Sequence, residues 1–283
     1  MDIKGTTRVC GLIGNPVGHS VSPAIHNNLA RLTGKDMVYT TFKVEKGDVA
    51  SAVRGAYSLN ILGLNVTVPH KSEVIDSLVD IDPLAKAIGA VNTLVRVDGG
   101  FKGYNTDILG LARELADSKV IILGAGGAAR AITFLCSSKN AQCVYLLNRT
   151  VDKAEAIAQA VNAHFNNDKV IPMNIADYDD IPGEDYVVIQ TTSVGLHPND
   201  TAVVIDDEAF YKKAAVGVDT IYNPGETMFM KLIKAQGKKA YNGLKMLLYQ
   251  GVSAYELWND CKITKEEADE VYKCLQKELG INE

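Results

Sequence analysis

Long apolar runs and blocks of like charge are both missing from this chain of 283 residues. No apolar stretch approaches the ~20 residues of a membrane-spanning helix, so no membrane partner is expected. The net charge of -5 is spread without long runs of one sign, which argues against a nucleic-acid partner. The first residues lack the charged-then-apolar layout of a secretory signal, and the expected location is the cytoplasm.

Paired cysteines and clustered histidines are also missing. The five cysteines form an odd number without close pairs, which argues against a disulfide framework and against a four-cysteine zinc site. The five histidines show no recognisable ligand spacing, so no metal is expected. What is present is 47% hydrophobic and 22% charged residues, the composition of an ordinary globular chain long enough for two domains.

The first hundred residues alternate β-branched runs with helical patterns, which is typical of βαβ units around a mostly parallel sheet. A hairpin with glycine turn chemistry is expected over Val91 to Tyr104. The other expected strands are Arg8 to Ile13, Met37 to Lys43 and Gly63 to Val68, and the expected helices are Pro23 to Leu32 and Gly47 to Ser58.

A second alternation begins at Lys119 and predicts a separate Rossmann-type domain. Its expected strands are Val120 to Leu123, Cys143 to Leu147, Lys169 to Met173, Tyr186 to Gln190 and Val216 to Asp219. Two helices over Leu244 to Leu279 have no strand of their own and are expected to pack on the first domain. The predicted fold is therefore α/β with two domains: a mostly parallel domain over 1–106, completed by 243–283, and a Rossmann-type domain over 107–242.

A glycine-rich turn between a predicted strand and a predicted helix matches a dinucleotide fingerprint. Gly124, Gly126 and Ala129 occupy the G-x-G-x-x-A positions, where a tight turn and a helix N-terminus favour a pyrophosphate. A turn with no ligand is the alternative interpretation. After the next strand comes Asn148-Arg149-Thr150, where NAD sites commonly carry an acidic residue. A guanidinium suits the 2′-phosphate of NADP instead, although a solvated arginine is the plainer alternative.

Two polar segments are candidates for substrate binding. Ser20 and Ser22 lie on a glycine- and proline-shaped loop before a helix, where they suit a carboxylate, while Ser22 also suits an N-cap followed by Pro23. Asn65 and Thr67 share one face of a buried-type strand, and Lys71 follows the strand at the edge where ligands of parallel sheets usually bind. A solvated lysine at a helix start is the alternative for Lys71.

Together with Gly89 to Thr93, Gly103 to Asp107, Tyr222-Asn223-Pro224 and Asn242-Gly243-Leu244, these segments closely resemble the shikimate dehydrogenase family. Nearly the whole chain is covered, in the family's order. The resemblance implies an NADP-dependent oxidoreductase that interconverts 3-dehydroshikimate and shikimate, in the biosynthesis of chorismate and aromatic amino acids. It also implies the two-domain fold with small-molecule ligands, and it leaves the oligomeric state open.

The resemblance also implies roles for individual residues. Lys71 and Asp107 look like the catalytic pair, and Lys71 is chemically suited to protonate the alkoxide that hydride transfer to a ketone leaves. The residues implied for substrate are Ser20, Ser22, Asn65, Thr67, Asn92, Asp107, Tyr222 and Gln250. Those implied for the cofactor are Gly124, Ala125, Gly126, Gly127, Ala128, Asn148, Arg149, Thr150, Thr220 and Gly243.

Three positions depart from the commonest family pattern. Gln190 stands where Asn is usual, Leu196 where Met is frequent and Asn242 where Asp is common, all on the expected nicotinamide side. Two other functions remain open: a quinate or quinate/shikimate dehydrogenase, and a noncatalytic sensor of NADP or shikimate. The Ser20/Ser22 pair and Arg149 favour the shikimate branch that uses NADP, and the presence of both Lys71 and Asp107 argues against a sensor.

Overall fold

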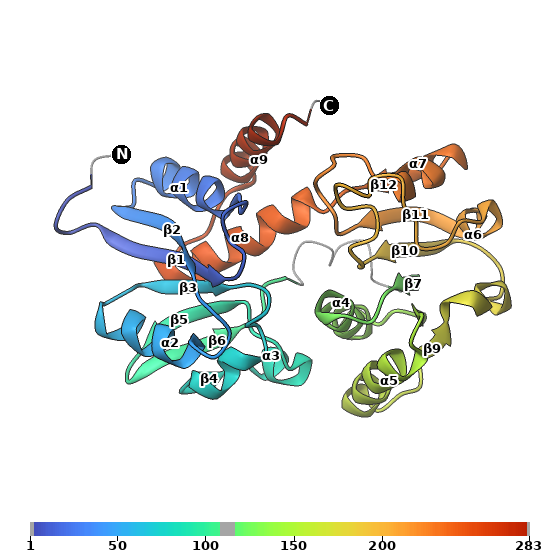
Figure 1. The fold of residues 1–283 in the computed structure, drawn as a ribbon, viewed down its shortest axis with the longest axis horizontal. Helices are drawn as coiled ribbons and strands as arrows, with labels where there is room; N and C mark the ends of the chain where they lie inside the picture. The colour runs from blue at the N-terminus through green and yellow to red at the C-terminus, as the bar shows by residue number, and fades with distance from the viewer. Residues whose placement is uncertain (1–2, 108–116, 282–283) are drawn as a thin grey trace. The chain divides into compact units, whose positions relative to one another are not determined.

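The computed structural model describes residues 3–107 and 117–281, and the chain forms two compact units (Figure 1). Unit 1 consists of Met1–Leu109 and Leu248–Glu283, and unit 2 consists of Gly110–Leu247. Helix α8, Leu244–Asn259, contains the second boundary, so most of this helix belongs to unit 1. Each unit is built on its own six-stranded sheet.

The sheet of unit 1 has the order β2-β1-β3-β5-β6-β4. The strands β1, β2 and β3 are parallel, β5 is antiparallel to both β3 and β6, and β4 is parallel to β6. Five strands therefore run one way and only β5 runs the other, which confirms a mostly parallel sheet. The strands are β1 Arg8–Gly14, β2 Met37–Lys43, β3 Gly63–Val66, β4 Asp80–Ile81, β5 Thr93–Val97 and β6 Gly100–Tyr104.

Helices cover the two faces of this sheet. Helix α2, Val49–Ser58, packs its apolar residues with Leu64 and Val66 of β3. On the other face, Trp258 of α8 donates a hydrogen bond from its indole nitrogen to the carbonyl of Leu94, and its ring lies tilted against His26 of α1 with 5.0 Å between the ring centroids. The remaining elements are α1 Ser22–Thr33, η1 Glu73–Ser77, α3 Pro83–Ile88 and α9 Lys265–Leu279, and α9 packs on α1.

Several expected boundaries in unit 1 are wrong by one or two residues, and two of them lie beside candidate site residues. Strand β3 ends at Val66 rather than Val68, because Pro69 has no N–H for a ladder and His70 N donates to the Thr67 carbonyl in a turn. Helix α1 begins at Ser22 with Val21 at the N-cap, so Ser22 is not the capping residue. The Ser22 N–H is instead accepted by the hydroxyl of Ser20, 3.2 Å away.

Unit 2 contains a fully parallel sheet with the order β12-β11-β10-β7-β8-β9. From β7 the chain builds outward first through β8 and β9, and then in the opposite direction through β10, β11 and β12. This reversal is the strand order of a Rossmann domain, and ligands of such sheets bind where the order reverses. The strands are β7 Lys119–Leu123, β8 Cys143–Asn148, β9 Val170–Asn174, β10 Tyr186–Gln190, β11 Ala214–Asp219 and β12 Lys239–Tyr241.

The helices of unit 2 follow its strands. Helix α4, Gly127–Ser138, follows β7 directly and packs beside α5, Val151–Phe165, while α7, Met228–Ala235, packs on β11 and β12. The short elements are η2 Ile175–Asp180 and α6 Glu208–Lys212. Within the described ranges of both units, no helix combines the length and the apolar character needed to cross a bilayer.

Candidate active site

The candidate catalytic residues of unit 1 lie at the carboxyl-end edge of its sheet. Asn65 is the next-to-last residue of β3, and Asp107 follows β6 by three residues. Thr93 opens the antiparallel strand β5 and pairs with both Asn65 and Tyr104, so it lies at the same edge. Side chains that are far apart in the sequence therefore meet where parallel strands usually present a ligand site.

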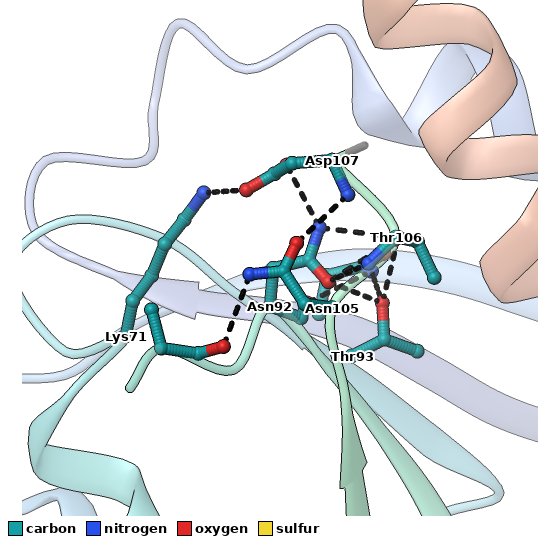
Figure 2. Close-up of polar contacts among 8 residues, drawn as sticks. Lys71, Asn92, Thr93, Asn105, Thr106 and Asp107 are labelled. Atoms are coloured by element: carbon teal, nitrogen blue, oxygen red, sulfur yellow. Dashed lines mark hydrogen bonds and ion pairs between the residues drawn. The ribbon is translucent and has the colours of Figure 1, made fainter. Parts of the chain in front are cut away.

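Lys71 and Asp107 form a direct ion pair at this edge (Figure 2). The Lys71 ammonium lies 2.6 Å from Asp107 Oδ2, and the side chains are 31% and 19% exposed. The turn that carries Lys71 is held to the strand region by the Val91 N–H, which donates to the Lys71 carbonyl over 2.8 Å. The pair is thus fixed at its base while its charged ends stay within reach of a ligand.

Asn92 holds the other oxygen of this carboxylate. Its Nδ2 donates to Asp107 Oδ1 at 2.8 Å and to Thr106 Oγ1 at 3.1 Å, while its Oδ1 accepts from the Thr106 backbone N–H at 2.8 Å and from the Thr93 hydroxyl at 3.0 Å (Figure 2). Asn92 is only 2% exposed, and every one of its amide hydrogens is engaged within the protein. Asp107 therefore receives one charged donor and one neutral donor, a geometry that fixes its orientation.

Three residues that the sequence analysis did not select complete this network. Thr93 and Thr106 are buried and lie 3.1 Å apart at their hydroxyls, and Thr93 accepts a hydrogen bond from Asn65 Nδ2 at 3.1 Å. Tyr39 of β2 donates its hydroxyl hydrogen to Asn65 Oδ1 at 2.8 Å. Both threonines stand inside motifs that were recognised, whereas Tyr39 stands in an ordinary β-branched strand where its ring predicts only a core position.

The remaining residues implied for substrate binding are distributed over both units. Ser20 donates to the Ser22 hydroxyl at 3.1 Å, so the two hydroxyls are adjacent as the motif suggests. Gln250 is a buried residue of α8 in unit 1, and Thr67 is half-buried just after β3. Tyr222 belongs to unit 2, where burial raises the pKa of its hydroxyl.

The glycine-rich turn of unit 2 joins β7 to α4 at the reversal of strand order. Gly124 has a φ of 108°, and a Cβ there would lie 2.8 Å from the Thr191 hydroxyl, so only glycine suits the position. A Cβ on Gly126 or Gly127 would meet no atom within 4 Å, which leaves open space in front of the α4 N-terminus. A twelve-residue helix thus directs its free N–H groups and partial positive charge at an accessible position.

Arg149 follows the end of β8, beside this turn in the fold. The residue is exposed, and its guanidinium makes no ion pair with any residue in the described ranges. The Asn148 amide donates to the Thr150 carbonyl at 2.8 Å, and the Asn174 amide reaches the Arg149 carbonyl at 3.4 Å. The backbone of this segment is fixed by neighbouring amides while the charged end of Arg149 is left for a ligand.

Loops after β10, β11 and β12 bring Thr220 and Gly243 together. Thr220 N donates to the Gln190 carbonyl, Gly243 N donates to the Ile221 carbonyl, and a Cβ on Gly243 would lie 2.2 Å from the Thr220 carbonyl oxygen. Asp219 lies fully buried beneath them and accepts from the Ile221 N–H and from the Thr227 hydroxyl. Burial raises the pKa of Asp219 to about 6, only partly offset by those two donors.

The three departures from the family pattern have different structural consequences. Gln190 is 1% exposed. Its side-chain Nε2 donates hydrogen bonds to the carbonyls of Thr192 and Val194, and its Oε1 accepts one from the Thr192 N–H, which closes the loop after β10. Asn242 bonds to the Gly225 carbonyl and accepts from the Leu244 N–H. Leu196 is exposed. Gln190 and Asn242 are thus part of the internal bracing of these loops.

Comparison with known families matches both units. Residues 12–94 match the family described as shikimate dehydrogenase substrate binding domain, and residues 107–197 match the family described as shikimate / quinate 5-dehydrogenase. The first match lies in unit 1, and the second covers the glycine-rich turn and Arg149 in unit 2.

Individual relatives match over almost their full length. A shikimate dehydrogenase (NADP(+)) of Bacillus anthracis is 40% identical over 262 residues, covering 90% of this chain and 93% of the relative. One of Methanobrevibacter smithii is 39% identical over 295 residues, covering 99% and 100%. The crystal structure of a shikimate dehydrogenase in complex with NADP+ is similar with a TM-score of 0.86 and 36% identity, covering 97% of each chain.

Proposed function

The chain belongs to the shikimate dehydrogenase family, and we propose that it interconverts 3-dehydroshikimate and shikimate with NADP as its cofactor. The observation that carries the proposal is the Lys71–Asp107 pair, held by Asn92 at the carboxyl-end edge of the unit 1 sheet. A protein that only binds a hydroxylated carboxylic acid does not require a lysine ammonium group and an aspartate carboxylate 2.6 Å apart.

The residues of unit 2 fit a phosphorylated dinucleotide. The N-terminus of α4, with open space at Gly126 and Gly127, provides donors for a pyrophosphate. The guanidinium of Arg149, which makes no ion pair within residues 3–107 and 117–281, provides donors for a 2′-phosphate. No acidic side chain stands at 148–150 to accept from ribose hydroxyls, which disfavours NAD. Gly124, Ala125 and Ala128 shape the turn, and Asn148, Thr150, Thr220 and Gly243 complete the proposed cofactor site.

When bound, NADPH supplies the hydride. The chain's own task is then to handle the proton, because reduction of the ketone leaves a negative charge on its oxygen. The Lys71 ammonium stabilises that charge and donates a proton from Nζ to the oxygen, and in the oxidative direction it takes the proton back. Asp107, fixed by Asn92, keeps the ammonium in place and accepts from a ring hydroxyl with its remaining lone pairs.

The rest of the substrate is held by side chains that do not react. In this proposal Ser20, Ser22 and Tyr222 bind the carboxylate, and Asn65, Thr67, Asn92 and Gln250 lie around the ring hydroxyls. The residues 1–106 and 243–283 form the substrate domain and 107–242 the cofactor domain. As part of the same proposal, the protein acts in the cytoplasm.

The experiment is reduced-cofactor formation by the purified protein with shikimate and with quinate, each assayed with NADP and with NAD. The proposal expects the highest kcat/KM with shikimate and NADP. A higher value with quinate identifies a quinate dehydrogenase. No turnover with any of the four pairs, together with binding of NADP or shikimate by calorimetry, identifies a sensor and contradicts the proposal.

A further inference from the structure

The strand order of unit 2 indicates where the two halves of a bound dinucleotide lie. Sheets of this topology consist of two halves that meet where the strand order reverses, and each half holds one nucleotide of the cofactor. Arg149 follows β8, and its proposed partner, the 2′-phosphate, belongs to the adenosine nucleotide. The nicotinamide nucleotide is then expected over the other half, at the carboxyl ends of β10, β11 and β12.

Asp219 is the last residue of β11 and therefore lies on the expected nicotinamide half. In the sheet register it pairs with Gln190, which pairs with Leu123, the residue before the glycine-rich turn. Two strand spacings, about 10 Å, thus separate Asp219 from the strand that carries this turn, and both residues end their strands at the same edge of the sheet. The side chain of Asp219 is fully buried at this edge.

The hydrogen bonds of Asp219 brace the loop over 220–227. Its Oδ1 accepts from the Ile221 N–H at 2.9 Å, and its Oδ2 accepts from the Thr227 hydroxyl at 2.6 Å. Thr227 is the N-cap of α7, and its oxygen also accepts from the Met230 N–H at 3.3 Å. An asparagine amide of the same shape would also bond to both partners, with its oxygen at Ile221 and its NH₂ at the Thr227 oxygen. Bracing alone therefore requires no negative charge.

The charge of Asp219 has no counter-ion in the part of the chain that the structure describes. Its carboxylate forms no ion pair within residues 3–107 and 117–281, and both of its donors are neutral. Burial raises the pKa of Asp219 to about 6, and the Thr227 hydroxyl and the Ile221 N–H oppose this rise. The group is therefore an anion at pH 8. A buried anion without a cation lowers the free energy of unfolding, which points to a role other than stability.

We propose that the buried Asp219 carboxylate is a counter-charge for the nicotinamide ring and shifts the binding preference of unit 2 towards NADP+ relative to NADPH. This inference rests on the proposed function, because it requires a nicotinamide cofactor on this sheet. The ring carries a positive charge in NADP+ and none in NADPH, whereas the phosphate groups are the same in both. A fixed anion near the ring therefore attracts one form only, and burial of the carboxylate limits the screening of that attraction by salt and water.

The same preference acts on hydride transfer. Because binding and reduction are linked in one thermodynamic cycle, stronger binding of the oxidised form lowers the reduction potential of the bound cofactor. When the hydride leaves bound NADPH, the ring becomes positive beside the Asp219 carboxylate. Asp219 thus makes the bound cofactor a better hydride donor to the ketone.

The test is calorimetric binding of NADP+ and of NADPH, each alone at pH 8, to the wild type and to Asp219→Asn. The control ligand is 2′,5′-ADP, which carries adenosine phosphates and lacks the nicotinamide. Asp207→Asn is the matched control variant. Asp207 also accepts from one backbone N–H, that of Ala209, and from one hydroxyl, that of Tyr178, but it is exposed at the start of α6.

Two further variants separate the charge from the bracing. Thr227→Val removes the hydroxyl donor and keeps the carboxylate of Asp219. Asp219→Ser is a second neutral variant with a smaller side chain. Circular dichroism melting verifies that each variant is folded.

In Asp219→Asn the Kd of NADP+ is expected to rise about 10-fold relative to the Kd of NADPH, because one attraction between unit charges in a partly buried site is lost. Asp219→Ser is expected to shift the ratio of the two Kd values in the same direction. Thr227→Val and Asp207→Asn are expected to keep the wild-type ratio. The Kd of 2′,5′-ADP is expected to be equal in Asp219→Asn and the wild type.

An unchanged ratio in folded Asp219→Asn would overturn the inference and leave the proposed function intact, since equal rises in both Kd values would mean that Asp219 only braces the loop. A shifted ratio in Thr227→Val would also overturn it, because the loop rather than the charge would then set the preference. If Asp219→Asn does not fold, Asp219→Ser decides by the same criterion. Failure of both neutral variants to fold would show that the charge stabilises unit 2 itself and would overturn the inference as well. A wild type that binds neither NADP+ nor NADPH would overturn it together with the proposed function.

Discussion

The two units prepare their ligand sites by different means. In unit 1 the site is a network of side chains, in which Lys71, Asp107, Asn92 and Asn65 bond to one another or to shared partners. In unit 2 the site is made largely of backbone, with a glycine-rich turn at a helix N-terminus and an arginine whose guanidinium makes no ion pair in the described residues. The site of unit 1 is preorganised by hydrogen bonds among its own side chains, whereas the site of unit 2 presents N–H donors to a ligand.

This difference follows from what each ligand requires. A substrate ring with several hydroxyls is distinguished by the direction of each hydrogen bond, so its readers need fixed orientations and become coupled to one another. Phosphate groups are recognised by charge and by N–H donors, which a helix N-terminus supplies without a side-chain network. Substitutions in unit 1 are therefore expected to affect several properties together, whereas those in unit 2 affect one.

The largest effect is expected from Lys71→Ala. The catalytic rate should fall by roughly 10²- to 10⁴-fold, as for a lost general acid-base group, while shikimate binding weakens less because the remaining network still holds the ground state. Steady-state kinetics and calorimetric shikimate binding measure the two quantities. Lys102→Ala is the control, since Lys102 pairs with Asp80 at 2.8 Å elsewhere on unit 1.

Near-native turnover with a raised Michaelis constant in Lys71→Ala would show that Lys71 only binds. The proton would then travel through Asp107 or water, and unit 1 would lose its proposed role in the chemistry.

A smaller and more local effect is expected from Arg149→Asp in unit 2. The kcat/KM for NADP should fall about 10- to 100-fold, because charge-assisted hydrogen bonds to the 2′-phosphate are lost, and the value for NAD should stay similar or rise. Initial rates with both cofactors measure the change. Lys139→Asp, at the far end of α4, makes the same change of charge on an exposed residue and should leave both values unaltered. Equal loss with both cofactors would assign Arg149 a structural role.

The smallest effect concerns stability and the buried base His26 of unit 1. Burial lowers the pKa of His26 to about 3, so below the unfolded value of 6.5 the unfolded chain takes up a proton that the folded chain does not. The contribution of His26 to the free energy of unfolding is thus fully present above pH 6.5 and is lost as the pH falls towards 3. Between pH 7 and pH 5 His26 should remove about 2 kcal/mol from the free energy of unfolding.

Urea unfolding at the two pH values measures this loss, with the fluorescence of Trp258 as the signal. Trp258 is the single tryptophan and lies in unit 1 beside His26, so it reports on that unit. His26→Phe should lose less stability than the wild type over this interval, and His164→Gln, at an exposed histidine of unit 2, should behave as the wild type. An identical pH dependence in wild type and His26→Phe would contradict the account.

The sequence predicted most of the long elements, because their periodicity and turn residues agree with the fold. It did not predict β4 or β12, which span only Asp80–Ile81 and Lys239–Tyr241 and are too short to carry a pattern. The end of β3 was misplaced because Pro69 cannot extend the ladder and the His70 N–H closes a turn on the Thr67 carbonyl. The start of α1 was misplaced because the Ser22 N–H bonds to the Ser20 hydroxyl and Val21 takes the N-cap position.

The candidate site was predicted in part. Lys71 and Asp107 stood out by motif, and the structure brings them to 2.6 Å. Thr93, Thr106 and Tyr39 were not selected, because a buried threonine or tyrosine looks the same in sequence whether it fills the core or holds a functional amide. Their role depends on side chains from β2, β3, β5 and the segment after β6 meeting across the sheet, which local pattern does not encode.

The central claim is that unit 1 performs the proton chemistry while unit 2 selects the cofactor. The most direct measurement is the ratio of kcat/KM with NADP to that with NAD, determined for shikimate oxidation by the wild type, Lys71→Ala and Arg149→Asp. The account predicts that Lys71→Ala lowers both values by the same factor and leaves the ratio unchanged, whereas Arg149→Asp reduces the ratio at least tenfold. A shifted ratio in Lys71→Ala, or an unchanged ratio in Arg149→Asp, would contradict it.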